Sequence, residues 1–421
     1  MAIEVLKEYN DVLNLVYKKE PVIFVTGSAG TGKSTFIAWL QTKVPDVVLA
    51  APTGIAAINI GGKTTNSLFM IPPNTLNDPE ELSQGVSSQV LKAANVVIID
   101  EVSMVTSNMV DCINKRLQQC RRNSKLFGGC TVIFVGDLLQ LPPVITGDVV
   151  NEYNKIYKSP MFYDALCLKG HHVSCIELTV VRRQSDDSFI NILRNIRRGE
   201  NLDEVVEAFN STCKFSSTPL ENTVVVTTVN RTVNTYNEAK LRKLTTHEET
   251  YVGEVTGTFP SERMTVPVFL DLKIGAQVIV TKNINELVYN GLIGTIVSMS
   301  DDVIVIKDAY DHKYQLKRAV WENVTYKVIN GKIETTVVGT YRQFPLKLGY
   351  AMTIHKSQGQ TLTSVYIDVE QGCFASGQMY VALSRCKTLE GITLSRPLSK
   401  HDIIVDSDVV DYYNKQASLI Q

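Results

Sequence analysis

A glycine-rich loop directly after an apolar stretch constrains the fold more than any other feature of the sequence. Residues 22–25 (VIFV) are β-branched or aromatic, which is typical of a buried strand. Residues 27–34 (GSAGTGKS) follow with the spacing G-x4-G-K-[ST] of a phosphate-binding loop. Such a loop turns backbone N–H groups onto phosphate oxygens at the N-terminus of a helix. The pattern therefore predicts an α/β domain that binds a nucleotide.

The loop and the next apolar stretch supply groups that nucleotide hydrolysis requires. Lys33 would bring a positive charge to the β- and γ-phosphates, and the Ser34 hydroxyl suits Mg²⁺. The stretch 95–99 predicts a strand buried on both faces of a parallel sheet. It leads to Asp100, a second candidate Mg²⁺ ligand, and to Glu101, a candidate general base for the attacking water. A surface acid pair is the alternative interpretation, and a nucleotide kinase would not need Glu101 here.

A third apolar stretch places an amide at the same edge of the predicted sheet. Residues 131–137 (TVIFVGD) predict a strand, and Gln140 lies just beyond its carboxyl end. Open α/β sheets bind their ligands at this edge. An uncharged amide in this position can sense the γ-phosphate and report its loss, so Gln140 is predicted to belong to the catalytic set.

Composition excludes some classes of protein. The chain has 421 residues, which allows two or three domains. With 42 basic and 43 acidic residues, a histone-like binder is excluded, but a translocase with a locally positive groove is not. The eight cysteines form no C-x-x-C pair, which favours reduced thiols in an intracellular protein. The first residues lack the basic-plus-apolar pattern of a signal segment, and no apolar stretch approaches ~18 residues, so neither a signal segment nor a membrane partner is expected.

Seven motifs, in family order, resemble the Pif helicase family of superfamily 1B. They are GSAGTGKST at 27–35, APTGIAAINIGGKTTNSLF at 51–69, VVIIDEVSMV at 96–105, FGGCTVIFVGDLLQLPPV at 127–144, LTVVRRQSDDSF at 178–189, LGYAMTIHKSQGQTL at 348–362 and YVALSRCK at 380–387. The resemblance implies an ATP-dependent DNA helicase that uses ATP and Mg²⁺. It implies 5′→3′ movement on single-stranded DNA and separation of duplex DNA, in replication, repair or recombination.

The resemblance also implies two RecA-like P-loop domains with parallel sheets. The first is expected at 1–175, with a small wedge insert at about 62–90 that would meet the duplex fork. The second is expected at 176–250 and 342–421. A β-rich, SH3-like insert at 251–341 would interrupt it and help to enclose the strand.

Local patterns fit this arrangement. Residues 295–300 and 303–307 predict a hairpin, and the Asn-Gly pair within 327–333 predicts a second one with a type I′ turn. Phe189, Ile192, Leu193 and Ile196 share one helix face, and Gly199 suits the position after the helix end.

By resemblance, the nucleotide site extends from the phosphate loop into the second domain. The nucleotide-binding positions are Gly27, Ala29, Gly30, Thr31, Gly32, Lys33, Ser34, Thr35 and Gly359, and the catalytic positions are Lys33, Asp100, Glu101, Gln140, Arg183 and Arg385. Arg183 and Arg385 resemble arginine fingers, which place a planar, permanent charge where negative charge develops on the γ-phosphate. Surface ion pairs are the alternative for both, and Arg183 is preferred over its neighbour Arg182.

Two positions depart from the family pattern. The family usually has a glutamine upstream of the phosphate loop that reads adenine, whereas Tyr9 and Asn10 lie at the matching place. Tyr9 is expected to stack on the base and Asn10 to bond its edge, which leaves strict preference for ATP open. The histidine of the family's Thr-x-His-Ser block is Asn66 here, beside Ser67, so one contact to the strand is altered.

A set of residues from both domains is expected to bind the DNA strand. They are Thr53, Gly54, Asn66, Ser67, Phe69, Asn230, Thr353, His355, Lys356 and Tyr380. Thr53 and the Gly54 N–H suit a backbone phosphate, and Phe69 suits stacking on a base, with core packing as the alternative for Phe69. The basic residues Lys115, Arg116, Arg121, Arg122 and Lys125 favour a solvated helix face over a nucleic-acid patch.

Three rival functions are weighed against a DNA helicase. An RNA helicase is disfavoured by the block that begins at Phe127, and a helicase–nuclease by the lack of a remaining acid or histidine cluster. A single-strand-stimulated ATPase remodeller that does not unwind alone stays open. The expected partners are single-stranded DNA, the duplex fork and replication or repair proteins. An intracellular, cytoplasmic enzyme of viral or bacterial type is favoured, with nucleus and mitochondrion left open.

Overall fold

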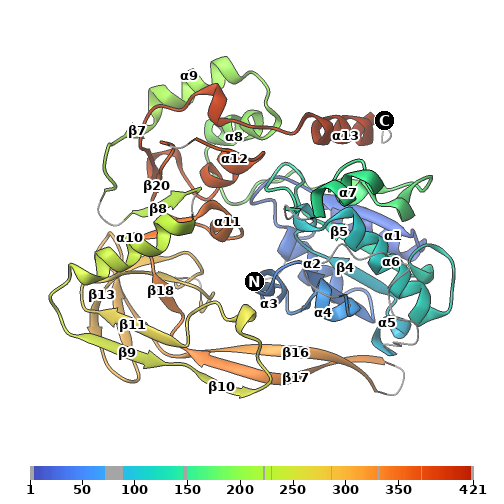
Figure 1. Ribbon diagram of the computed structural model, residues 1–421, viewed down its shortest axis with the longest axis horizontal. Coiled ribbons are helices and arrows are strands. Elements are labelled where there is room, and N and C mark those ends of the chain that lie inside the picture. The colour runs from blue at the N-terminus through green and yellow to red at the C-terminus, as the bar shows by residue number, and fades with distance from the viewer. Residues whose placement is uncertain are drawn as a thin grey trace. The chain divides into compact units, whose positions relative to one another are not determined.

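The computed structural model forms two compact units (Figure 1). It describes the whole chain except residues 1–3, 72–88, 146–148, 221–222, 229, 286, 330–331, 371 and 419–421. The first unit comprises Met1–Arg182, Asn323–Val338 and Asp411–Gln421, and the second comprises Arg183–Glu322 and Gly339–Val410. The chain therefore leaves the first unit at Arg182 and returns to it twice.

The first unit is built on a six-stranded sheet in the order β3-β2-β4-β5-β1-β6, with parallel neighbours throughout. Its strands are β1 Val22–Thr26, β2 Val47–Ala51, β3 Lys63–Thr64, β4 Val96–Ile99, β5 Thr131–Val135 and β6 Ser174–Glu177. Every residue of β1, β4 and β5 is buried, because helices cover both faces of a parallel sheet. The predicted apolar strands and the predicted α/β class are confirmed.

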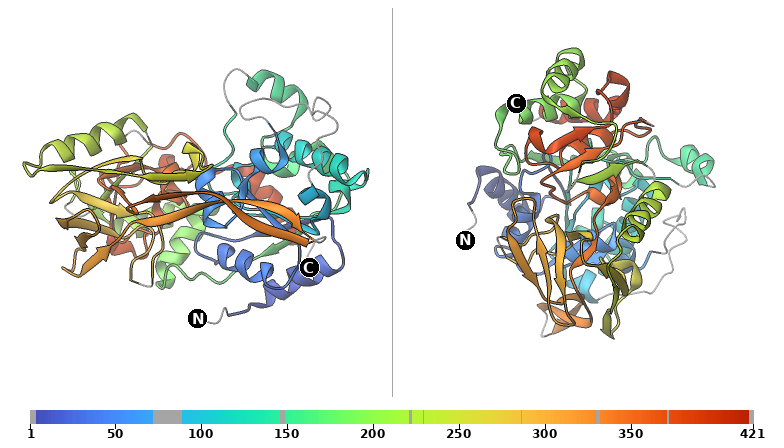
Figure 2. Two further views of the ribbon diagram at one scale, coloured as in Figure 1. Left: turned by 90° about the horizontal axis from the view of Figure 1, so that it is seen from below. Right: turned by 90° about the vertical axis from the view of Figure 1, so that its left-hand side faces the viewer.

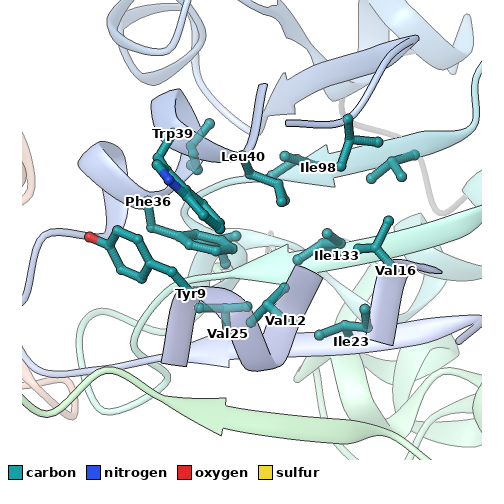
Figure 3. Packing of buried hydrophobic residues seen from close by; sticks show 14 of the residues in the cluster. Tyr9, Val12, Val16, Ile23, Val25, Phe36, Trp39, Leu40, Ile98 and Ile133 are labelled. Atoms are coloured by element: carbon teal, nitrogen blue, oxygen red, sulfur yellow. The ribbon is translucent and has the colours of Figure 1, made fainter. Parts of the chain in front are cut away.

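Helices flank this sheet. They are α1 Lys7–Tyr17, α2 Lys33–Gln41, α3 Gly54–Asn59, α4 Thr65–Phe69, α5 Gln89–Ala93, α6 Ser107–Arg121 and α7 Val150–Ile156. Figure 3 shows α1 and α2 packed beside the sheet through Tyr9, Val12, Phe36 and Trp39, all of which are buried. Each large side chain buried in this way contributes about 1.5–3 kcal/mol relative to an exposed one. The cluster fixes the helix that begins at Lys33 against the strand that precedes the loop.

The second unit contains a five-stranded parallel sheet in the order β19-β8-β20-β21-β7. Its strands are β7 Lys214–Phe215, β8 Val224–Thr227, β19 Ala351–Thr353, β20 Val365–Ile367 and β21 Ile392–Leu394. The helices are α8 Asp187–Arg198, α9 Leu202–Thr212, α10 Asn230–Arg242, α11 Ile354–Ser357 and α12 Gln378–Leu383. The predicted apolar face of α8 is buried, and Gly199 ends that helix at φ 70°, as predicted.

Antiparallel strands follow in the chain between β8 and β19, all within the second unit except residues 323–338 of β16 and β17. They are β9 Glu248–Val252, β10 Glu254–Gly257, β11 Phe269–Lys273, β12 Gln277–Val280, β13 Ile293–Met299, β14 Ile304–Lys307, β15 Lys313–Leu316, β16 Ala319–Ile329, β17 Lys332–Gln343 and β18 Leu346–Leu348. Five of them form the sheet β15-β14-β13-β12-β18. The predicted hairpin at 295–307 is confirmed by the antiparallel pairing of β13 with β14. The turn predicted at Asn330-Gly331 and much of the predicted wedge lie outside the described residues.

Two segments from late in the sequence complete the first unit. Strands β16 and β17 form a long ribbon (Figure 2), and its residues 323–338 belong to the first unit. There the Tyr326 hydroxyl accepts the Leu49 N–H at 3.1 Å, and Lys63 Nζ donates to Thr325 Oγ1 at 3.3 Å. The final helix, α13 Ser407–Ser418, contributes its residues from Asp411 onward. The domain boundaries proposed from the sequence stay a prediction.

Candidate active site

The phosphate loop connects the buried end of β1 to the start of α2, and it depends on glycine. Gly27, Gly30 and Gly32 have φ angles of 155°, 85° and 83°. A Cβ at Gly27 would lie 2.7 Å from the Leu178 carbonyl oxygen, so no other residue fits without a shift. Gly32 is the N-cap of α2, and no side chain caps the first N–H groups of that helix. This geometry suits an anion that accepts those N–H groups.

Lys33 lies over this loop. Its Nζ donates to the carbonyl oxygens of Gly27 at 2.7 Å and Ser28 at 3.0 Å. Thr31 is buried and donates its hydroxyl to Ser28 at 2.9 Å, whereas Ser34 is exposed. The loop therefore combines a fixed backbone with an ammonium group and a hydroxyl at the surface, which are the groups predicted for phosphate and Mg²⁺.

The acid pair follows β4 and is electrostatically strained. Asp100 is 8% exposed. Burial and, to a smaller extent, the neighbouring Glu101 carboxylate raise the pKa of Asp100 to about 7, against the lowering effect of the Glu101 backbone hydrogen bond and of the Lys33 charge. Glu101 adopts a left-handed backbone conformation, with φ 51°. A desolvated carboxylate beside a second carboxylate favours a bound cation, so Asp100 and the Ser34 hydroxyl fit a magnesium site.

Gln140 is held by a residue that the sequence interpretation did not assign. The amide Nε2 of Gln140 donates to Asp137 Oδ2 at 3.4 Å, and the Leu139 N–H donates to Asp137 Oδ1 at 3.2 Å. Asp137 is 1% exposed and follows β5 directly after Gly136. The sequence feature that could have identified Asp137 is its place as an acidic residue just after a buried strand. Because β1, β4 and β5 are parallel, Lys33, the acid pair and Gln140 follow the same edge of the sheet.

In the second unit, the two predicted arginine fingers meet at one residue. Arg183 Nη1 donates to the Ser384 carbonyl at 3.1 Å, and Arg385 Nη2 donates to the Ser384 hydroxyl at 2.7 Å. Gln184 donates to the carbonyls of Ser384 and Cys386 at 3.3 and 2.9 Å. Arg385 is 1% exposed, and Arg183 is half-buried. Their roles toward a γ-phosphate stay a prediction.

The interpretation of Tyr9 as a base-stacking residue is corrected. Tyr9 is 1% exposed, and its ring lies 5.2 Å from that of Phe36 and 5.3 Å from that of Trp39, measured between centroids (Figure 3). No ring face is available to adenine in this structure. The Tyr9 hydroxyl instead donates to the Gly32 carbonyl at 3.4 Å, so Tyr9 stabilises the phosphate loop through this bond. Asn10 is exposed.

The predicted strand contacts of the first unit divide into surface and core residues. Thr53 caps α3, since its Oγ1 accepts the Ala56 N–H at 3.2 Å, and its own O–H can still donate to a phosphate. Asn66 donates to the Ile71 carbonyl at 3.2 Å, and Ser67 is exposed. Phe69 is fully buried, so the prediction that it stacks on a base is wrong for this conformation, and core packing is correct.

Two arginines of the predicted basic face are structural. Arg116 is 1% exposed and donates to the carbonyls of Phe69 at 2.9 Å and Met70 at 3.3 Å. Arg121 donates to the carbonyls of Gly128 at 2.8 Å and Ala94 at 2.7 Å. The favoured interpretation of a solvated helix face is therefore wrong for both side chains. They satisfy main-chain acceptors at the end of α4 and around α5 and β5.

The predicted contacts of the second unit cluster at the start of α11. Thr353 is 2% exposed, and its Oγ1 accepts the Lys356 N–H at 3.3 Å. Lys356 and Gly359 are exposed, and burial lowers the pKa of His355, which favours its neutral form. Tyr380 is 3% exposed, so its predicted contact with DNA is not available in this conformation.

Asn230 and Lys347 also belong to the second unit. Asn230 is the first residue of α10, and its side chain lies outside the described residues. Lys347 on β18 was not among the site residues predicted from the sequence. Burial and the charge of Lys356 lower the pKa of Lys347 to about 8. No sequence pattern marks this lysine, because the strand that carries it is only three residues long.

Other classes of site are not evident. Among the described residues, no group of three or more His, Cys, Asp or Glu side chains is placed to hold a metal ion. None of the eight cysteines forms a disulfide, and burial raises the pKa of Cys130, Cys175 and Cys373 to about 12 in each case. Within the part of the chain that the structure covers, no helix combines the length and apolar character of a membrane span.

The first unit carries a phosphate loop, an acid pair and an amide at one edge of a parallel sheet. The second unit, which contains its own parallel sheet, carries paired arginines. Together these features are those of the P-loop helicase class. The sequence profile of the PIF1-like helicase family matches residues 2–207. The chain is 30% identical to the ATP-dependent DNA helicase Pif1 of Bdellovibrio bacteriovorus, over 98% of this chain and 92% of that protein. This chain therefore belongs to the PIF1-like helicase family, and its two units contain two RecA-like domains.

Two further relatives are similar to this chain over nearly its whole length. The chain is 33% identical to the ATP-dependent DNA helicase PIF1 of Danio rerio, over 99% of this chain but 64% of that protein. The chain thus spans less than two thirds of the vertebrate relatives that it matches. A crystal structure of Bacteroides Pif1 helicase in complex with ADP-AlF3 and ssDNA is 34% identical, with a TM-score of 0.70 and coverage of 99% of this chain and 98% of that one.

Proposed function

We propose that this chain is an ATP-dependent DNA helicase that moves 5′→3′ along single-stranded DNA and separates duplex DNA in replication, repair or recombination. The observation that carries the proposal is the edge of the first unit's sheet, where Lys33, the acid pair and Gln140 follow three parallel strands. The Bacteroides relative crystallised with a nucleotide analogue and single-stranded DNA supports the same activity.

Hydrolysis is assigned to residues of the first unit. Lys33 would exchange its bonds to Gly27 and Ser28 for bonds to the β- and γ-phosphates. Ser34 and Asp100 would hold Mg²⁺, which would supply positive charge to stabilise the phosphates. Glu101 would accept the proton of the attacking water, because it is the carboxylate left without the metal.

Coupling to movement is assigned to the second unit. Arg183 and Arg385 would turn from Ser384 and its neighbours toward the γ-phosphate. Their attraction to this phosphate would favour closure of the two units on ATP and opening after hydrolysis. Thr53 and Gly54 would grip the strand from the first unit, and His355 and Lys356 from the second. Alternating grips move the strand in one direction. Separating one base-pair step costs about 1.4 kcal/mol, which one coupled hydrolysis supplies.

The test is strand separation on matched partial duplexes, one with a 5′ tail and one with a 3′ tail, with ATP and Mg²⁺. Unwinding of the 5′-tailed DNA alone, lost in Lys33→Ala, is the expected result. A substrate with an RNA tail separates the DNA helicase from an RNA helicase. ATP hydrolysis stimulated by single strands without separation on any substrate would replace the proposal with a remodeller that does not unwind alone.

We also propose replication or repair proteins as partners and an intracellular location. Cysteines that form no disulfide, six of the eight being buried, fit a reducing compartment. Co-purification of the chain with replication or repair proteins from the source cells would support the partner assignment.

A further inference from the structure

The last helix places one tyrosine hydroxyl inside the first unit. Tyr413 on α13 is 6% exposed, and its hydroxyl lies 2.7 Å from the hydroxyl of Thr26. The same oxygen accepts the Leu138 N–H at 3.1 Å. Tyr413, Thr26 and Leu138 all belong to the first unit. One side chain from the end of the sequence thus joins two segments that precede it by 387 and 275 residues.

Both partners of this hydroxyl adjoin the proposed chemistry. Thr26 is the last residue of β1 and directly precedes Gly27 of the phosphate loop. Leu138 lies between Asp137 and Gln140, on the turn that carries the proposed γ-phosphate sensor. The backbone pairing of β1 with β5 ends nearby, where the Gly136 N–H donates to the Val25 carbonyl at 3.1 Å. The Tyr413 hydroxyl continues this connection beyond the last paired residues of the two strands.

We propose that Tyr413 is a positioning residue for ATP hydrolysis, which fixes the Gln140 turn relative to the phosphate loop. The inference rests on the proposed function, because it concerns the rate of that reaction. Tyr413 touches no reacting atom. It acts by restricting the Leu138 backbone, so its loss lets the neighbouring amide of Gln140 sample positions away from the γ-phosphate. A small displacement of a catalytic group costs rate without a matching loss of ground-state binding.

The same helix offers a matched control. Tyr412 stacks on Tyr163 with ring centroids 4.0 Å apart and an interplanar angle of 8°. Its hydroxyl is buried and makes no hydrogen bond among the described residues. Tyr412→Phe therefore removes a hydroxyl from the neighbouring position without removing a hydrogen bond. Tyr413→Phe removes the bridging hydroxyl and keeps its ring, whose centroid lies 6.2 Å from that of Phe24.

The test compares these variants in the full chain with ATP, Mg²⁺ and single-stranded DNA. Tyr413→Phe is expected to lower kcat by about tenfold, the effect on rate of one lost hydrogen bond. The KM for ATP and the affinity for ADP should change less than about twofold, because ADP has no γ-phosphate for Gln140 to contact. Tyr412→Phe should match the wild type. Thr26→Val should lower kcat as Tyr413→Phe does, whereas Thr26→Ser, which keeps a hydroxyl, should retain most of the rate.

A double-mutant cycle separates positioning from general destabilisation. If Tyr413 acts through the Gln140 turn, adding Tyr413→Phe to Gln140→Ala should lower kcat by less than about twofold further. Equal losses in both backgrounds, or an equal loss in Tyr412→Phe, would overturn the inference. A wild-type chain that does not hydrolyse ATP, or a Lys33→Ala variant that does, would overturn the proposed function and this inference with it. Active wild type with an unaffected Tyr413→Phe would overturn the inference alone.

Discussion

Asp137 and Gln140 form a buried pair in which the carboxylate of one accepts the side-chain amide of the other, with 3.4 Å between Oδ2 and Nε2. Asp137→Ala removes this acceptor and the acceptor for the Leu139 N–H. We expect kcat for ATP hydrolysis to fall by about 100-fold, because a displacement near 1 Å can cost that much. The KM for ATP should change little. Asp137→Asn keeps one acceptor oxygen and should lose less, and equal kcat in all three proteins would contradict the assignment.

The phosphate loop is predicted to reject any side chain at position 27. In Gly27→Ala, the new Cβ would meet the Leu178 carbonyl oxygen at 2.7 Å and Thr31 Oγ1 at 2.6 Å, so the loop must shift. Binding of a fluorescent ATP analogue should weaken by at least about tenfold, equivalent to about 1.4 kcal/mol. Gly170→Ala is the control, because Gly170 also has a positive φ of 80° but has nothing within 4 Å of the new Cβ. Comparable loss of binding in both variants would show that the clash at position 27 is not the cause.

Much of the fold, and the placement of the candidate site residues at one edge of the first sheet, was predictable because it is encoded locally. The β1 strand and the glycine loop are contiguous in sequence, and the acid pair and Gln140 each follow an apolar stretch by a few residues. Parallel pairing then brings these separate loops to one edge without any further information. The helix face around Phe189 and the cap at Gly199 were predictable for the same reason.

The wrong predictions concern residues whose role depends on the direction in which the side chain points. Phe69 and Tyr380 lie inside motifs that otherwise face a ligand, but both are buried, since an aromatic ring next to a polar motif can face either the core or the ligand. Tyr9 fills the space between Phe36 and Trp39, and no local pattern specifies that packing. Tyr413 contacts Thr26 across 387 residues, which only the tertiary fold brings together.

The buried guanidinium of Arg116 is predicted to stabilise the fold and not to bind DNA. Arg116→Met would leave the carbonyls of Phe69 and Met70 without this donor, at a cost of about 1–3 kcal/mol for each buried acceptor left unsatisfied. The midpoint of thermal unfolding should fall by several degrees. The salt dependence of single-strand binding, measured at a temperature where both proteins are folded, should keep its slope. Lys125→Ala, which changes an exposed residue, should alter neither quantity, and a shallower slope in Arg116→Met alone would restore the nucleic-acid interpretation.

A partly buried ion pair in the second unit, with side chains 33% exposed at Arg396 and 4% at Asp402, should make part of its stability depend on pH. Asp402 accepts bonds from Arg396 Nη1 and Nη2, both at 2.8 Å, and from the Ser399 N–H at 2.8 Å. Burial acts to raise the pKa of Asp402, but the bonds from Arg396 and Ser399 outweigh it, so this pKa lies below its usual value. The pair's contribution is therefore complete above the unfolded-state pKa of about 3.9. It is lost as the pH falls through the lower, folded-state pKa.

Asp402→Asn tests whether the stabilisation by this ion pair is lost as the pH falls. At pH 7 the variant should lose about 1.5–3 kcal/mol of stability, the range for hydrogen bonds to charged groups. Its deficit in unfolding midpoint relative to the wild type should shrink as the pH is lowered below about 4, because the wild-type carboxyl then also becomes neutral. Asp203→Asn is the control. Its partner Lys400 lies 2.6 Å away, but the two side chains are 83% and 53% exposed, so the pair is screened by water and contributes little. A deficit in Asp402→Asn that is constant from pH 7 to pH 3 would show that packing, and not the charge, is lost.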